Sequence, residues 1–344
     1  MSDSDIEFDL GEENVPSGLE KLKGEAVQLP ADSDARKFWR DLLTKQKLEE
    51  VDGLPSYLKV ESNLVDGGAT TLIYRDCYEH LISRIIHCWN HESRQCLLTG
   101  TPGIGKTIFG YFLIRHLFRK KLAKSVAYVA GKSLYLITLD PMIKKELGIE
   151  TDVVVFEDVK DVHNNALLKD KRIVVIHDPE RKATEPAHSR NTEAPCRLFI
   201  LSYGHAYIRI FKRKDIGPEL RYWFYGPLWD HDEGKRWEPI LREANPFLNM
   251  EEALNIFGGS VRKWMQAKGE KEFETLTADL KNFVLTIVKT HPTTTDVQMH
   301  TNENSWRGTI IQIAVPFDEH SPLWECKELK TALESSGVSV ELCL

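Results

Sequence analysis

One eight-residue segment constrains the fold of this chain more than any other part of the sequence. Residues 100–107 read Gly-Thr-Pro-Gly-Ile-Gly-Lys-Thr and match the pattern G-x-x-x-x-G-K-[ST] at every fixed position. Glycine adopts backbone dihedral angles that other residues avoid, so such a loop can point successive N–H groups at a polyphosphate. The segment therefore predicts a loop that holds the phosphates of a nucleotide.

The residues on either side of this loop support that interpretation. Residues 95–99 (QCLLT) are typical of a short buried strand, and residues 108–118 (IFGYFLIRHLF) of a helix whose N-terminus would face the phosphates. Lys106 would neutralise charge on the β- and γ-phosphates of ATP, and the Thr107 hydroxyl would ligate Mg²⁺. The alternative is an ordinary glycine turn. The residues expected to bind the nucleotide here are Thr101, Pro102, Gly103, Ile104, Gly105, Lys106, Thr107 and Ile108.

Four further apolar runs predict the architecture around the loop. SVAYVAG, DVVVFEDV, KRIVVIHD and CRLFILSYG are short, rich in β-branched residues and separated by stretches of helical pattern. Such alternation predicts a parallel sheet that helices cover on both faces. We therefore expect an α/β protein: a P-loop NTPase with a parallel sheet sandwiched by helices, a helical lid subdomain and a small C-terminal extension.

A P-loop protein that uses magnesium needs an acid at the tip of a buried strand, and the sequence offers two candidate positions. Asp178 ends the run KRIVVIHD, whereas Glu157 and Asp158 follow the run VVVF. We expect the strand that carries the acid to lie next to the P-loop strand, and we favour Asp178 over Asp158 as the Mg²⁺ ligand. Glu180, separated from Asp178 by Pro179, is a candidate water-orienting base, with a solvated loop acid as the alternative.

Three other segments are candidates for contact with the nucleotide. Ser202 ends the run CRLFILS, where its hydroxyl would reach the γ-phosphate or merely cap the strand end. Arg262 follows the segment 258–261 (GGSV), and its guanidinium would stabilise transferring phosphoryl charge or lie on the surface. Tyr74 and Arg75 precede a predicted helix, where they would contact adenine or be surface residues at the helix start.

Composition changes along the chain and suggests five regions. Residues 1–34 are acidic and poor in apolar residues, which predicts a disordered leader. Residues 35–60 suggest an N-terminal helical segment, and 61–210 the P-loop NTPase core. Residues 211–270 suggest a helical lid subdomain dense in aromatic residues, and 271–344 a C-terminal α/β extension.

Charge and hydropathy narrow the class of protein. The 344 residues carry a net charge of −7, which argues against a surface dominated by nucleic-acid contacts because these need clustered Lys and Arg. No apolar run approaches the roughly 18 residues of a membrane span, and the N-terminal residues lack the pattern of a secretory signal.

The six cysteines form no C-x-x-C pair and are expected to be buried thiols. Since no N/T-K-x-D motif is present, ATP is favoured over GTP.

An ordered set of segments extends from about residue 60 to residue 270. It comprises Ile73-Tyr74-Arg75-Asp76-Cys77-Tyr78, residues 100–107, Asp178, Ser202, Tyr225-Gly226-Pro227-Leu228-Trp229 and Phe257-Gly258-Gly259-Ser260-Val261-Arg262. In this combination the chain resembles the P-loop ATPase domain of the Crinkler and retrotransposon-hot-spot effector families. These families belong with the STAND and AAA-like branch of P-loop proteins.

The resemblance implies Mg²⁺-dependent ATP hydrolysis coupled to a toxin-like domain. It also implies secretion into host cells, action in the host nucleus or cytoplasm, a host nuclear protein or DNA as partner, and nucleotide-dependent homo-oligomers. Without an effector role, we expect a cytoplasmic or nuclear protein. The chain departs from the family in lacking an L-x-L-F-L-A-K leader, and the tail after residue 270 is short for a complete nuclease.

Two other functions stay open. The chain could be a nucleotide-binding interaction module with little turnover, which presents its tail to a partner. It could also be a nucleic-acid-cleaving effector that uses the C-terminal extension, where Pro316, Asp318, Glu325 and Lys327 partly match a metal-nuclease motif. The spacing of these residues is short and the segment around Glu325 has a helical pattern, so a solvated helix is the simpler interpretation.

Overall fold

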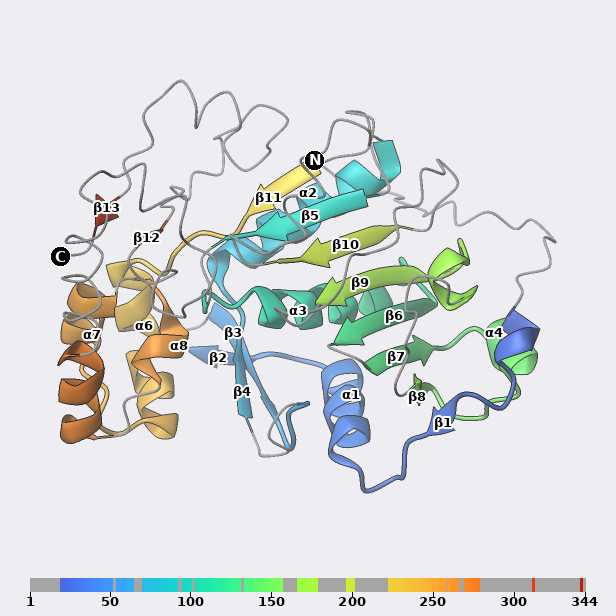
Figure 1. Cartoon of the computed structure of the whole chain (residues 1–344), viewed down its shortest axis with the longest axis horizontal. Helices are drawn as coiled ribbons and strands as arrows, with labels where there is room; N and C mark the ends of the chain where they lie inside the picture. The colour runs from blue at the N-terminus through green and yellow to red at the C-terminus, as the bar shows by residue number, and fades with distance from the viewer. Residues whose placement is uncertain are drawn as a thin grey trace. The chain divides into compact units, whose positions relative to one another are not determined.

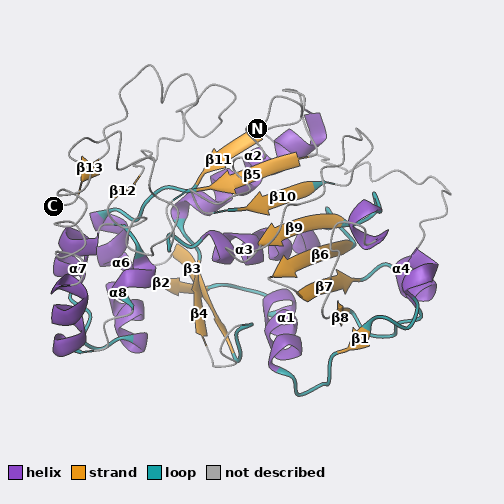
Figure 2. Cartoon of the chain, in the orientation of Figure 1, coloured by secondary structure: helices purple, strands orange, loops and turns teal. Residues whose placement is uncertain are grey.

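The chain combines a mixed, mostly parallel β-sheet with helices, as expected for an α/β protein (Figures 1 and 2). A computed structural model describes residues 19–51, 54–64, 70–91, 95–100, 103–130, 133–156, 166–178, 196–201, 222–257, 259–265, 269–278, 311–312 and 341–342. The chain divides into two compact units. The first comprises Met1–Leu97, Thr107–Ile200 and Ile210–Tyr222, and the second comprises Leu98–Lys106, Leu201–Arg209 and Trp223–Leu344.

The main sheet has eight strands in the order β1-β8-β7-β6-β9-β10-β5-β11. Their bounds are β1 Val27–Gln28, β5 Gln95–Thr99, β6 Ser125–Ala130, β7 Ser133–Thr138, β8 Val153–Phe156, β9 Val174–Asp178, β10 Arg197–Ile200 and β11 Tyr222–Tyr225. Strands β6, β9 and β10 pair in parallel. In Figure 1, β5, β10, β9 and β6 point the same way, so their carboxyl ends share one edge of the sheet.

The prediction of a parallel sheet is right for the centre of the sheet and wrong beyond β6. Strand β7 pairs antiparallel with both β6 and β8, and β1 pairs antiparallel with β8. Only residues 131–132 connect β6 to β7, and so short a connection joins antiparallel strands only. The sequence analysis did not predict β7 at all, and so it also missed the hairpin.

A second correction concerns the strand that carries Asp178. We expected it to lie next to the P-loop strand, but β10 lies between β9 and β5. Sequence order alone does not give this arrangement, because a crossover connection can return the chain to any free position in a parallel sheet. Asp178 is nevertheless the last residue of its strand, as predicted.

Helices and two short helical turns complete the first unit. They are η1 Leu19–Leu22, α1 Asp34–Thr44, α2 Asp76–His91, α3 Lys106–Arg119, α4 Pro141–Leu147 and η2 Ala166–Lys169. The core contains buried apolar side chains from β6, β7, β8 and β9, together with α4 and η2. On α1, Phe38 and Trp39 are fully buried and pack edge-on against Tyr111 of α3, at ring-centroid distances of 4.8 and 6.0 Å.

The N-terminal predictions need correction at two places. A disordered leader was expected through residue 34, yet Leu19 is fully buried in the core and β1 pairs with β8. Helix was expected across 35–60, but among the described residues of this range only those of α1 are helical. Residues Glu49–Val51 (β2) and Leu54–Val60 (β3) form an antiparallel sheet with Thr70–Ile73 (β4). Pro55 disfavours helix, and the β3–β4 pairing places Leu58 and Val60 in the core.

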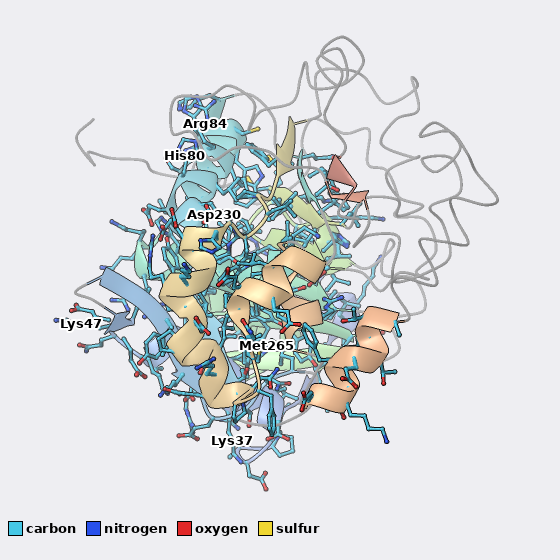
Figure 3. The ribbon with its side chains drawn as sticks, turned by 90° about the vertical axis from the view of Figure 1, so that its left-hand side faces the viewer. Lys37, Lys47, His80, Arg84, Asp230 and Met265 are labelled. Atoms are coloured by element: carbon cyan, nitrogen blue, oxygen red, sulfur yellow. The ribbon has the colours of Figure 1, made fainter. Side chains whose placement is uncertain are left out.

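The second unit contains helices where a helical lid subdomain was predicted. They are α6 His231–Ala244, α7 Met250–Phe257 and α8 Val261–Trp264. Asp230 caps α6, since its side chain accepts a hydrogen bond of 2.7 Å from the backbone N–H of Glu233 (Figure 3). In the predicted C-terminal extension, the described residues comprise a helical stretch at 270–278 and a two-residue antiparallel pair between β12 Ile311–Gln312 and β13 Glu341–Leu342.

Candidate phosphate-binding loop

The loop between β5 and α3 has the backbone that its glycines predict. Gly100, Gly103 and Gly105 have φ values of 141°, 87° and 97°, in the region that side chains disfavour. A Cβ atom at Gly103 would lie 2.5 Å from Ser260 Oγ and 2.8 Å from Arg262 Cβ, so glycine is required there for space as well as for conformation. The prediction of a tightly wound glycine loop between a strand and a helix is confirmed for these residues.

Lys106 begins α3 and is buried, with 8% of its surface exposed. Its Nζ donates a hydrogen bond of 2.9 Å to the carbonyl oxygen of Gly100, at the other end of the loop. The ammonium group therefore links the two ends of the loop in this structure. Thr107 and Ile108 follow in the first turn of α3 and are half-buried.

The segment after β11 contacts the loop directly. The backbone N–H of Gly226 donates to the carbonyl oxygen of Thr99 at 2.8 Å, where β5 ends. The indole Nε1 of Trp229 donates to the carbonyl oxygen of Ile104 at 3.3 Å. A Cβ at Gly226 would lie 2.8 Å from the Ile104 side chain, so this glycine permits close approach to the loop. The structure thus places the segment Gly226–Trp229, singled out in the sequence, against the loop.

The segment that carries Arg262 also contacts the loop. The backbone N–H of Arg262 donates to the carbonyl oxygen of Gly103 at 3.4 Å. Ser260 is buried beneath, whereas the Arg262 side chain is exposed. The structure therefore brings the backbone of Arg262 to the loop, while its side chain is exposed, as the alternative of a surface arginine expects. The predicted interaction of its guanidinium with phosphate stays a prediction.

Asp178 lies in the first unit, at the carboxyl end of β9 and opposite Ala130 of β6. Its Oδ2 accepts a hydrogen bond of 3.1 Å from the hydroxyl of Tyr128. Tyr128 also shares a side-chain hydrogen bond with Tyr111 of α3. The Tyr111 and Tyr128 rings lie 5.5 Å apart, centroid to centroid. Asp178 is thus held at the end of a chain of two phenols.

Burial keeps these two phenols neutral further into the alkaline range than an exposed tyrosine. Desolvation raises the pKa of Tyr128 well above its usual value, and the neighbouring Asp178 carboxylate raises it further. Desolvation likewise raises the pKa of Tyr111. Both hydroxyls therefore remain protonated at neutral pH and can act as donors. Sequence reasoning missed both tyrosines. The available signal was a polar tip inside an apolar strand, since a buried Tyr hydroxyl usually has a partner.

Tyr74 and Arg75 lie just before α2. The Tyr74 hydroxyl donates to Glu79 Oε2 at 2.5 Å, and its ring packs edge-on against Phe112 of α3, 4.9 Å between centroids. Burial and the Glu79 bond raise the pKa of Tyr74. Arg75 is only 2% exposed, so the interpretation of this pair as surface residues is wrong for Arg75. Contact of either residue with adenine stays a prediction.

Several predicted site residues lie outside the described part of the chain. They are Thr101, Pro102, Glu157, Asp158, Glu180 and Ser202, together with the tail residues Pro316, Asp318, Glu325 and Lys327. Within the described residues, no group of three or more His, Cys, Asp or Glu side chains is placed to hold a metal ion. None of the described helices is both long and apolar enough to cross a membrane.

Comparison with known proteins identifies no family. No model of a known protein family matches the chain, and a search of curated proteins finds no significant match. Functional inference therefore rests on the residues and the geometry described above.

Proposed function

We propose that this chain binds and hydrolyses ATP with Mg²⁺ as cofactor. The observation that carries the proposal is the loop Gly100–Lys106, in which three glycines adopt positive φ and a buried lysine ends the loop at the start of a helix. Backbone N–H groups in such a turn form a concave site for anions, and the helix N-terminus adds a favourable dipole. A plain glycine turn needs no buried lysine at the start of the following helix.

Individual residues have distinct roles in this proposal. Lys106 contacts the β- and γ-phosphates, which adds a positive charge where negative charge develops. Thr107 and Asp178 would hold Mg²⁺, because this ion is usually bound by one or two protein oxygen ligands together with phosphate oxygens. That donor set fits a site without a three-carboxylate cluster. When bound, Mg²⁺ neutralises charge on the phosphate oxygens.

Three further roles belong to the proposal. Arg262 stabilises the transferring phosphoryl group through its exposed guanidinium. Glu180 orients the attacking water and Ser202 senses the γ-phosphate. The resemblance to Crinkler and retrotransposon-hot-spot effectors supports coupling of the nucleotide state to a host protein or DNA. Nucleotide-dependent homo-oligomers and action in a host nucleus or cytoplasm follow from the same resemblance.

Phosphate release from ATP with and without Mg²⁺ tests this proposal. We expect Mg²⁺-dependent release that exceeds release from GTP, and a loss of roughly 10²-fold or more in Lys106→Ala, as for removal of a key electrostatic group. Lys120→Ala is the matched control, since Lys120 is an exposed lysine near the end of the same helix. Equal rates for Lys106→Ala and the wild type would contradict the proposal.

The second proposed function is a nucleotide-binding interaction module with little turnover, the alternative that the sequence leaves open. Calorimetry with Mg·ATP, followed by assay of the same sample for phosphate, separates the two functions. Tight binding without phosphate release supports a nucleotide-binding interaction module and excludes hydrolysis as the main activity.

A further inference from the structure

Two carbonyl groups of the loop accept hydrogen bonds from donors elsewhere in the second unit, to which the loop itself belongs. The Gly103 carbonyl accepts from the backbone N–H of Arg262 at 3.4 Å, and the Ile104 carbonyl accepts from the indole of Trp229 at 3.3 Å. In a trans peptide the C=O and the following N–H point in opposite directions. Bonds that draw these two carbonyls outward therefore direct the N–H groups of Ile104 and Gly105 to the opposite side of the loop.

The two donors also fix one another. The backbone N–H of Trp229 donates to the carbonyl oxygen of Gly259 at 3.4 Å, just before the segment that ends at Arg262. A Cβ at Gly259 would lie 2.6 Å from the Trp229 carbonyl oxygen, so the two segments pack without a side chain between them. The Trp229 indole is 5% exposed and packs edge-on against Trp264 of α8 at 5.8 Å. Contacts with Gly259 and Trp264 therefore hold Trp229 in place independently of its bond to the loop.

We propose that Trp229 is a positioning residue for the phosphate-binding loop. Its indole N–H, together with the backbone N–H of Arg262, orients the peptides of residues 103–105 so that their amides face the phosphates. This inference rests on the proposed function, since the amides matter only if the loop binds phosphate. If Trp229 only packed in the core, its ring would be required but its N–H group would not. A variant that keeps the ring and loses the N–H therefore separates a positioning role from core packing.

Trp229→Phe tests the inference, because it keeps an aromatic ring and removes the donor. We expect calorimetry to show about fivefold weaker binding of Mg·ADP, the size expected for one lost hydrogen bond. Mg²⁺ with inorganic triphosphate should weaken by the same factor, since the loop contacts phosphate and not the base. In turnover, KM for ATP should rise while kcat stays within about twofold, as expected when ground-state and transition-state binding fall equally.

Trp39→Phe is the matched control. Trp39 is also fully buried, but its indole N–H has no hydrogen-bond partner among the described residues. The same loss of volume should therefore leave binding of triphosphate at saturating Mg²⁺ unchanged. Equal binding by Trp229→Phe and wild type overturns the positioning role and leaves the proposed function standing. Absence of binding by the wild type overturns both.

If Trp229→Phe does not fold, a second pair of variants tests whether donors from the neighbouring segments orient the loop peptides. Arg262→Ala removes the guanidinium, and Arg262→Pro removes the guanidinium and the backbone donor to Gly103. Proline is tolerated in the first turn of a helix, where Arg262 lies in α8, but its Cδ would take the place of the N–H that points at the Gly103 carbonyl and so also displace that carbonyl. We expect triphosphate binding at least threefold weaker in Arg262→Pro than in Arg262→Ala. Equal binding by the two variants overturns outside support of the loop.

Discussion

The candidate phosphate-binding loop and Asp178 are held in place by different means. The loop is defined by backbone: glycine dihedrals, carbonyls that accept bonds from Trp229 and Arg262, and a lysine that bonds the Gly100 carbonyl. Asp178 ends a regular strand, and its carboxylate is oriented by a side chain, Tyr128. A change that disturbs the loop backbone should therefore abolish nucleotide binding. Changes in the side chains around Asp178 should instead weaken Mg²⁺ binding by amounts that depend on the side chain replaced.

The largest expected effect comes from Gly103→Ala. The added Cβ would meet Ser260 Oγ at 2.5 Å and would force a φ of 87° on an alanine. We expect loss of detectable Mg·ATP binding by calorimetry. Gly24→Ala is the control, because Gly24 has the same φ, 88°, with no atom within 4 Å of the added Cβ. It should cost about 1–2 kcal/mol of stability through backbone strain and leave ATP binding intact. Normal binding by Gly103→Ala would refute the loop assignment.

The next largest effect is expected for Asp178→Asn. If this carboxylate holds Mg²⁺, its loss should lower kcat by roughly 10²-fold and shift the Mg²⁺ dependence to higher concentration. Rates measured across a Mg²⁺ titration check this. Asp158→Asn, the alternative weighed from the sequence, should leave the profile unchanged. A large loss in Asp158→Asn with a normal Asp178→Asn would reverse the assignment.

Tyr128→Phe should have a smaller effect of the same kind. It removes the hydroxyl that donates to Asp178 Oδ2 while leaving the buried ring. Loss of a group that orients a metal ligand typically costs about tenfold in metal affinity. We expect the half-maximal Mg²⁺ concentration to rise by about that factor, with little change in the rate at saturating Mg²⁺. An unchanged titration would show that Asp178 needs no support from Tyr128.

The smallest expected effect is on stability at alkaline pH. Tyrosine ionises near pH 10 in the unfolded chain, whereas burial raises the pKa of Tyr128 in the folded state. The neutral phenol therefore stabilises the fold fully below pH 10, and this contribution is lost as the pH rises above 10 toward the folded-state pKa. At pH 10.5 the loss is about 0.8 kcal/mol for one such group. Urea unfolding at pH 8 and 10.5 should show a smaller fall for Tyr128→Phe than for the wild type; an equal fall would contradict this.

The sequence predicts the loop more completely than it predicts the surroundings of Asp178. The loop is a contiguous motif, so its glycines, its lysine and its flanking strand and helix could be assigned from spacing alone. Asp178 could be placed at a strand end because the run before it is apolar. Its neighbours could not, since Tyr111, Tyr128 and Asp178 are far apart in the chain and meet only when β6, β9 and α3 pack together.

The sequence by itself determined the local backbone of the loop, because only glycine adopts the positive φ values at residues 100, 103 and 105 without strain. It also determined that buried β-branched runs form strands. The tertiary structure decided the strand order, the antiparallel β7 hairpin and the contacts of Trp229 and Arg262 with the loop. The physical reason is that these depend on pairing and packing between distant segments, which no local pattern of residues encodes.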